Sequence, residues 1–176
     1  MKHIIQTYIS RASFHKSVDE EIYKQIRYHL ISDEYVMSQL VNWKSIYIRG
    51  MIYIEFDGIV FMDKLDADMI PESWSSFLNV IVDMMDTGIG VETSCEQGFC
   101  LSMKRIDSRT IELCNYRGND YPSIYIYGKP YQLLPPIFDA IHECCEIMGK
   151  YITMNAMKEQ LRIVRAKADE WMKSFR

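Results

Sequence analysis

The chain has 176 residues, a mass of 20.8 kDa, 48% apolar residues and a formal net charge of −4. These values fit one globular domain over residues 1–176 and exclude an intrinsically disordered chain. No apolar run reaches the roughly 18 residues of a membrane-spanning helix, and the first residues lack the apolar stretch of a signal peptide, so we expect a cytoplasmic protein without a membrane partner.

The amino-terminal third of the chain is expected to be mainly helical. The segment from His3 to Ile9 is short and apolar, and it forms either a strand or an irregular lead-in. Ser17 and Glu20 have the spacing of a capping box, which predicts the start of a helix. Apolar residues then recur at helical spacing, with a weaker stretch in the middle, so we expect two helices or one kinked helix up to about Asn42. The apolar positions are Ile22, Ile26, Leu30, Ile31, Val36, Met37, Leu40 and Val41.

From Ser45 the apolar period changes from helical to alternating, which predicts strands. The alternation runs to Phe56, and Asp57-Gly58 separates it from a second apolar run at 59–62. Asp-Gly tolerates the positive φ angles of a two-residue turn, so the two runs predict a β-hairpin. Gly50 inside the first run marks either a bulge or a break between two short strands.

One helix and a series of strands are expected to follow the hairpin. Pro71 suits the first turn of the helix, which should end near Gly88. Its apolar face consists of Trp74, Phe77, Leu78, Ile81, Met84 and Met85. The later strand-like runs are too close together for crossover helices, so they should pair as an antiparallel meander. These runs are Gly90 to Cys95, Phe99 to Lys104, Thr110 to Tyr116 and Ser123 to Tyr127.

The carboxy-terminal part is expected to form one long helix. It should open at Pro135-Pro136 and run to the end of the chain, with Gly149 as a kink. Its last part carries a heptad seam, which either packs on the chain's own helices and sheet or joins two copies in a homodimer. The seam residues are Met154, Met157, Leu161, Val164, Ala168, Trp171 and Phe175; Met154, Met157, Leu161, Val164 and Trp171 are the ones expected in a homodimer.

Taken together, these elements predict an α+β fold. We expect an antiparallel β-meander of about five to six strands with N-terminal helices, one inserted helix and a long C-terminal helix.

Negative charge is concentrated in one part of the chain. Residues 51–100 hold ten acidic groups and one basic group. A negative surface attracts and orients a basic partner, and it repels nucleic acid. The alternative is an ordinary solvated helix with its turns, because acidic residues also favour helix starts. The residues expected to contact a partner are Glu55, Asp57, Asp63, Asp66, Asp68 and Glu72.

The sequence carries no motif of enzyme chemistry, and we expect neither catalysis nor a metal or other cofactor. The five cysteines have poor spacing for zinc and are expected to be reduced thiols. The carboxylates at 63–68 resemble a calcium loop only superficially, because position twelve of such a loop is Trp74 rather than Glu. Pairs of Cys95, Cys100 or Cys114 with His29 or His142 are possible nucleophile and base, and His142 could join Cys145 or Glu146 in a metal site, but such combinations have little specificity.

A small, acidic α+β domain with this order of elements resembles bacterial immunity proteins, which neutralise secreted toxins. The resemblance extends over the whole chain and rests on architecture and charge. It implies a non-catalytic inhibitor that binds a cognate toxin, often a basic nuclease, in the cytoplasm of the producing cell. Exposed tyrosines are further candidate anchors, namely Tyr47, Tyr53, Tyr125 and Tyr127. The alternatives are a homodimeric or scaffold subunit that assembles through the heptad seam, and a small-molecule sensor or enzyme.

Overall fold

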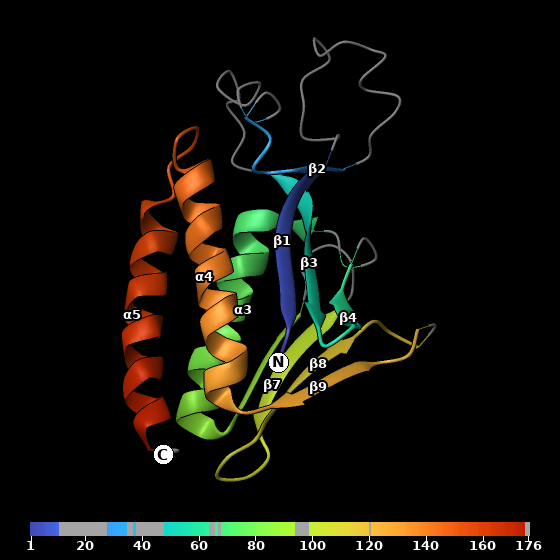
Figure 1. Ribbon diagram of the computed structural model, residues 1–176, viewed down its shortest axis with the longest axis vertical. Coiled ribbons are helices and arrows are strands. Elements are labelled where there is room, and N and C mark those ends of the chain that lie inside the picture. Colours follow the sequence, from blue (N-terminus) through green and yellow to red (C-terminus); the bar gives the residue numbers. More distant parts are fainter. Residues whose placement is uncertain are drawn as a thin grey trace.

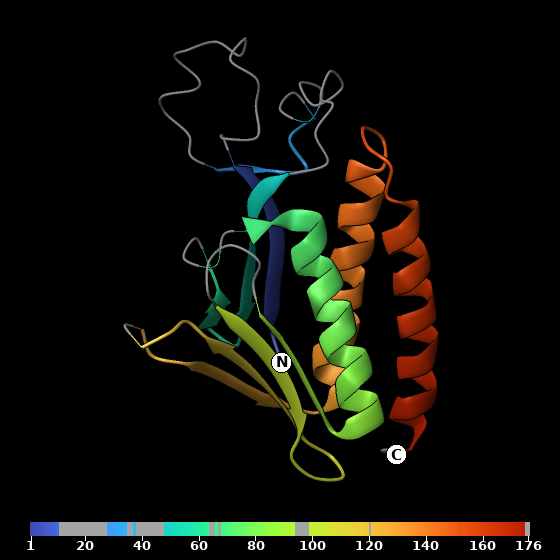
Figure 2. The same ribbon diagram turned by 180° about the vertical axis from the view of Figure 1, so that it is seen from behind.

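The computed structural model describes residues 1–10, 28–34, 37, 48–63, 66, 68–93, 99–119 and 121–174, and structural statements below refer to these residues. The described part is α+β: two antiparallel sheets lie beside a set of helices, and the helices all lie on one side of the sheets (Figure 1). The same arrangement seen from behind shows no described helix on the other side (Figure 2). One face of the four-stranded sheet is therefore left uncovered by helices.

The first sheet has five strands in the order β2-β1-β3-β4, with β5 paired to the start of β3, and all its pairings are antiparallel. The predicted turn at Asp57-Gly58 is confirmed, because both residues have positive φ angles of 48° and 84°. The strands are β1 (His3–Ser10), β2 (Tyr28–Leu30), β3 (Arg49–Phe56), β4 (Ile59–Met62) and β5 (Asp68–Met69).

Gly50 is neither a bulge nor a break, because β3 runs through it with continuous pairing to β1. A Cβ atom at Gly50 would lie 2.0 Å from the Tyr8 carbonyl oxygen and 2.8 Å from the Ile70 side chain. The glycine therefore allows close packing at this point rather than a change of direction. The irregularity in register lies instead between Ile54 and Glu55, opposite β4.

Most of the predicted N-terminal helical region lies outside the described residues, and one described part of it is a strand instead of a helix. Residues 11–27 and most of 35–47 lie outside the described part of the chain. Within the predicted helical stretch, residues 28–30 form strand β2, with Leu30 opposite Tyr8 of β1. Pairing with a neighbouring strand outweighs helical spacing here, because secondary-structure preference is a weak determinant beside tertiary contacts.

The inserted helix and the antiparallel pairing of the strands after it agree with the prediction. The expected meander of about five to six strands is wrong, because the strands divide between a five-stranded and a four-stranded sheet. Helix α3 (Ile70–Thr87) has Pro71 in its first turn and ends at Gly88, whose φ angle is 88°. The following strands form a separate four-stranded sheet in the order β6-β7-β8-β9, all antiparallel. These strands are β6 (Ile89–Thr93), β7 (Cys100–Arg105), β8 (Ile111–Tyr116) and β9 (Ile124–Gly128).

The carboxy-terminal part forms two helices instead of one. Helix α4 (Pro130–Met148) begins before Pro135-Pro136, with Pro130 in its first turn. A backbone N–H at this position has no intrahelical acceptor, so a proline there costs no hydrogen bond. The chain leaves α4 at Gly149 and turns back into α5 (Asn155–Lys173). The turn lets the apolar face of α5 pack on the rest of the molecule. A continuous helix would project away from the molecule and leave this face exposed.

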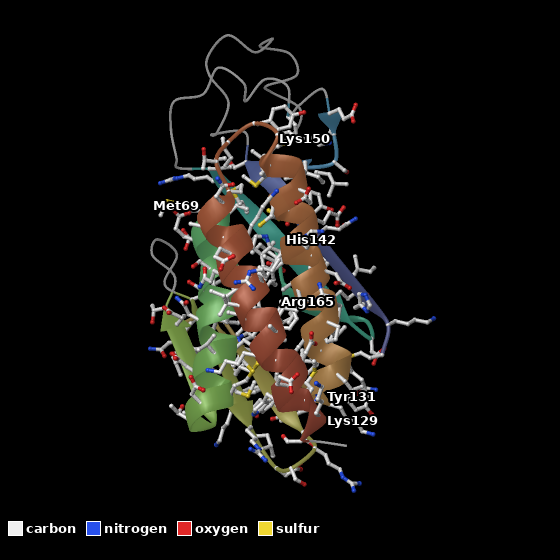
Figure 3. All side chains as sticks on the ribbon, turned by 90° about the vertical axis from the view of Figure 1, so that its left-hand side faces the viewer. Met69, Lys129, Tyr131, His142, Lys150 and Arg165 are labelled. Carbon is white, nitrogen blue, oxygen red and sulfur yellow. The ribbon has the colours of Figure 1, made fainter. Side chains whose placement is uncertain are left out.

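Helix α5 lies over the groove between α3 and α4 (Figure 3). Its seam residues Met154, Met157, Leu161 and Val164 are buried inside this chain, and Trp171 is half-buried against the core. The buried part of the seam therefore packs on the chain's own helices, and Phe175 lies outside the described residues. Exposed ion pairs also join α5 to both neighbours, namely Lys167 with Asp86 of α3, and Arg165 with Asp139 and Lys158 with Glu146 of α4.

The core is continuous across both sheets, and two buried polar side chains join its parts. The Asn115 amide nitrogen donates to the Phe61 carbonyl oxygen at 2.9 Å and so links β8 to β4. The Trp74 indole N–H donates to the Thr7 hydroxyl at 3.2 Å and links α3 to β1. Both contacts satisfy polar groups that would otherwise be buried without partners.

Candidate functional site

The six acidic residues expected at a partner interface do not lie on one surface. Three of them occupy the hairpin and the end of β4: Glu55 is half-buried, and its carboxylate accepts a hydrogen bond from the Tyr53 hydroxyl at 2.6 Å. This bond raises the pKa of Tyr53 above its usual value. Asp57 is exposed in the turn and accepts a hydrogen bond from the Lys2 backbone N–H at 2.7 Å. Asp63 lies one strand length away, at the other end of β4.

Asp66 belongs to the interior rather than to a surface. Its residue exposure is 1%, and its two carboxylate oxygens accept hydrogen bonds from the Arg117 guanidinium in a bidentate ion pair, with 2.8 Å between Nε and Oδ1. Asp63 also lies near Arg117, at 3.4 Å, and its backbone N–H donates to Asp66 at 3.0 Å. In this structure Asp66 is therefore paired within the chain and is not exposed at the surface.

Asp68 is also buried, with 6% of its surface exposed, and its Oδ1 accepts a hydrogen bond from the Met69 backbone N–H at 2.8 Å. This bond has a consequence for Glu72. Met69 is the N-cap of α3 and Glu72 is the third residue of the helix, where a glutamate usually accepts a bond from the N-cap N–H. Because Asp68 occupies that donor, the Glu72 carboxylate is left without its usual partner.

Glu72 differs from Asp66 in the partners of its carboxylate. Its Oε2 atom is buried and has no hydrogen-bond partner among the described residues. The side chain lines a narrow pocket, in which the space open to water is about 10 Å³, and also an open groove of about 280 Å³ between the starts of α3 and α5. Glu72 therefore stands between a confined space and one that is accessible from outside.

The narrow pocket is lined by both acidic and apolar side chains. Asp68, Glu72 and Glu92 line it together with serine and threonine hydroxyls, and no lining residue that the structure describes is basic. Glu92 accepts a hydrogen bond from the Asn79 amide at 3.1 Å. The apolar part of the lining consists of Met62, Phe77, Phe99 and Leu101. A space of about 10 Å³ holds about one water molecule, so a basic side chain would reach Glu72 from the groove rather than through this pocket.

Two of the predicted tyrosine anchors are exposed. Tyr125 and Tyr127 point away from the helices on β9, and their rings stack with centroids 6.4 Å apart. The hydrogen bond to Glu112 raises the pKa of Tyr127. Tyr53 is half-buried on β3, and Tyr47 lies outside the described residues.

Among the described residues, the structure does not bring His142 beside Cys100 or Cys114, and the side chain of His29 lies outside them. The four described cysteines are free thiols, as predicted, and Cys95 lies outside the described residues. Burial raises the pKa of Cys144 to about 12 and that of Cys145 to about 11, so neither is a thiolate near neutral pH. His142 is exposed on α4, among the helices, whereas Cys114 lies on the sheet beside Ser102 and Tyr125 (Figure 3).

Metal binding and membrane insertion find no support in the described residues. Across these ranges, no three histidine, cysteine, aspartate or glutamate side chains come together in a way that could hold a metal ion. No described helix combines the length and apolarity that a membrane span requires.

Sequence reasoning missed the two residues that decide the chemistry of this region. Arg117 was part of a predicted loop, and its position directly after a strand was the only local sign of an ordered role. Glu92 was counted only as one of the ten acidic groups. The fold and this acidic pocket define the class of the chain only as an α+β protein. No protein-family model matches it, and searches of curated proteins and of solved structures find no significant match.

Proposed function

We propose that this chain is a non-catalytic, protein-binding inhibitor that neutralises a cognate basic toxin, such as a nuclease, in the cytoplasm of the producing cell. The observation that carries the proposal is Glu72, whose buried carboxylate oxygen has no hydrogen-bond partner among the described residues. A buried carboxylate without a partner is unfavourable, and a positively charged group that approaches it restores the missing interaction. A lysine or arginine of the toxin supplies such a group.

The groove supplies a route for that side chain. It is lined by residues from the starts of α3 and α5, including Glu72, Ser75 and Gln160. Ser75 and Gln160 already hydrogen-bond each other at 3.0 Å, so the walls of the groove are held in place. An ordered site loses little conformational freedom on binding, which favours affinity. Asp57, which is exposed in the turn of the hairpin, adds long-range attraction for a basic partner.

The test is capture of the partner with a matched pair of variants. The purified chain, its Glu72→Gln variant and its Asp83→Asn variant are immobilised and exposed to native lysate at low and moderate salt. Asp83 is an exposed acid on the same helix, so its variant removes the same charge outside the pocket and groove. We expect the wild type and D83N to retain one basic protein that leaves as salt rises, and E72Q to retain much less.

The retained protein is then assayed for toxicity and enzymatic activity with and without the chain. Inhibition by the wild type and D83N, with weaker inhibition by E72Q, supports the proposal. Equal retention by all three proteins, an acidic partner, or binding without inhibition contradicts it.

A further inference from the structure

The side of the four-stranded sheet that faces away from the helices has no described element packed on it (Figures 1 and 2). Successive residues of a strand point to opposite faces, and the residues that point toward the helices are buried, among them Leu101, Met103 and Leu113. We name the opposite side chains the outer face: Ile89, Val91, Thr93, Cys100, Ser102, Lys104, Glu112, Cys114, Tyr116, Tyr125 and Tyr127.

The outer face is rich in exposed large side chains. Val91 is 52% exposed and Tyr127 is 56% exposed, and Ile89, Tyr116 and Tyr125 are also among the exposed large hydrophobic residues. Aliphatic side chains lie on β6 at one side of the sheet, and the stacked tyrosines lie on β9 at the other. Exposed apolar groups gathered on one face are typical of a protein interface, in which aromatic residues contribute most.

The register of the strands arranges these side chains in rows across the sheet. The first row is Ile89, Lys104, Glu112 and Tyr127, one residue from each strand, since each is the Cα partner of the next. The second row is Val91, Ser102, Cys114 and Tyr125. In each row the two outer positions are apolar or aromatic, and in the first row the two inner positions carry opposite charges.

We propose that the outer face binds a second copy of this chain, with a two-fold axis that lies in the interface, parallel to the strands, between β7 and β8. This rotation exchanges β7 with β8 and β6 with β9. It places Lys104 of each copy opposite Glu112 of the other, and Ile89 of each copy opposite Tyr127 of the other. In the second row Val91 meets Tyr125. One symmetry operation therefore places opposite charges against each other and aliphatic against aromatic side chains, which gives the self-complementary surface of an isologous interface.

Charge complementarity favours a second copy over the basic toxin at this place. Lys104 and Glu112 lie side by side near the centre of the outer face, so their charges balance and do not attract a basic partner, whereas a second copy places each of them opposite its counterpart. The inference goes beyond the proposed function, because the groove at Glu72 lies between α3 and α5 and shares no lining residue with the outer face.

The size of the outer face predicts a weak, reversible dimer. Three inter-strand spacings of about 4.8 Å and five residues of about 3.3 Å span roughly 14 by 17 Å before side chains extend the area. Stable interfaces bury about 800 Å² on each partner. We therefore expect monomers at micromolar concentration and dimers as the concentration approaches millimolar.

The experiment is sedimentation of the full chain over this concentration range, repeated with Lys104→Glu and Glu112→Lys. Each single variant places like charges opposite each other in its homodimer, so we expect each to weaken dimerisation by about tenfold or more. Lys150→Glu is the control, because Lys150 is exposed in the turn between α4 and α5, away from the outer face (Figure 3). It should dimerise like the wild type.

Mixing the two single variants makes the test specific to this interface. The Lys104→Glu chain carries glutamate at both positions 104 and 112, and the Glu112→Lys chain carries lysine at both. In each homodimer the two contacts between positions 104 and 112 are therefore repulsive, whereas in the heterodimer both are attractive. Mixing does not change the like-charged pair within each chain. Recovery of dimers in the mixture can therefore come only from contacts between the two copies. Ile89→Lys, which places a charge at the exposed β6 edge, should also weaken dimerisation.

A wild type that stays monomeric near millimolar concentration overturns the proposal. So do single variants that dimerise like the wild type, or a mixture that does not dimerise more than its components. Circular dichroism of each variant identifies any that does not fold, and the interpretation then rests on the remaining variants and on the wild type.

Discussion

Asp66 and Glu72 lie six residues apart in the same acidic stretch, yet the fold treats their charges in opposite ways. Asp66 is buried and holds Arg117 in a bidentate ion pair. Glu72 is half-buried, and one of its carboxylate oxygens has no hydrogen-bond partner among the described residues. The difference arises because a distant loop brings a base to Asp66, while Asp68 takes the backbone donor that Glu72 would otherwise use.

Local density of acidic residues is therefore a poor measure of acidic surface. What decides the role of each carboxylate is the partner that the tertiary structure brings to it. A partnered buried group stabilises the fold, and its loss should be measurable in the free energy of unfolding. An unpartnered group contributes little there and is available to a ligand or partner. The following substitutions test this distinction, in order of decreasing expected effect on stability.

Asp66→Ala should have the largest effect, a loss of about 3–5 kcal/mol in the free energy of unfolding, because it leaves the Arg117 charge in a largely buried site without its main partner. Urea denaturation followed by circular dichroism measures the change. The exposed acid Asp83 supplies the control, since Asp83→Asn should change stability by less than about 0.5 kcal/mol.

Replacing both partners of this ion pair sharpens the result. An apolar pair, Asp66→Leu with Arg117→Met, removes both charges at once and should recover most of the loss seen with D66A alone. A D66A protein as stable as the wild type would contradict the structural role of the pair.

Thr7→Val should rank second, with a loss of about 1–3 kcal/mol, because it removes the acceptor of the Trp74 indole N–H in the core. Valine keeps the shape of threonine, so the loss reports the hydrogen bond rather than a cavity. The Cys144 thiol lies beside both groups but is only a weak acceptor. Thr153→Val, at an exposed position before α5, is the matched control. Equal melting of T7V and T153V would show that the indole N–H finds another partner.

Asp63→Asn should rank third, with a loss of about 0–1 kcal/mol. Its carboxylate lies 3.4 Å from Arg117 and is 33% exposed, so solvent screens the interaction. In the D66A background the same substitution should cost more, because Asp63 is then the remaining acidic neighbour of Arg117 and the two sites share one partner. Additive losses in the double variant would show that Asp63 and Asp66 act independently.

The parts of the fold that the sequence predicted are those whose signals are local. Helix α3 follows from its apolar spacing with Pro71 and Gly88 at its ends, and the hairpin follows from Asp57-Gly58. The strands of the meander follow from alternation and short connections. Each of these signals acts within a few residues, where propensity and turn chemistry determine the structure.

The parts that could not be predicted depend on distant contacts. Strand β2 forms because Leu30 meets Tyr8 of β1, against a helical pattern. No local pattern in the sequence indicates that the strands divide into two sheets, which are linked by the hydrogen bond from Asn115 to the Phe61 carbonyl oxygen. The site follows the same rule: Glu72 was among the predicted residues, but its isolation depends on Asp68, and the burial of Asp66 depends on Arg117, 51 residues away.

Glu72→Gln should have the smallest effect on stability, below about 0.5 kcal/mol in either direction. Two opposing contributions nearly cancel. A negative charge in the first turn of α3 stabilises the helix by about 0.3–1 kcal/mol, and the variant loses this contribution. The variant also removes the cost of burying an unpartnered carboxylate oxygen. Urea denaturation of E72Q beside wild type measures the balance. A loss as large as that of D66A would mean that Glu72 has a structural partner, and the salt-sensitive binding assigned to it would then need another carboxylate.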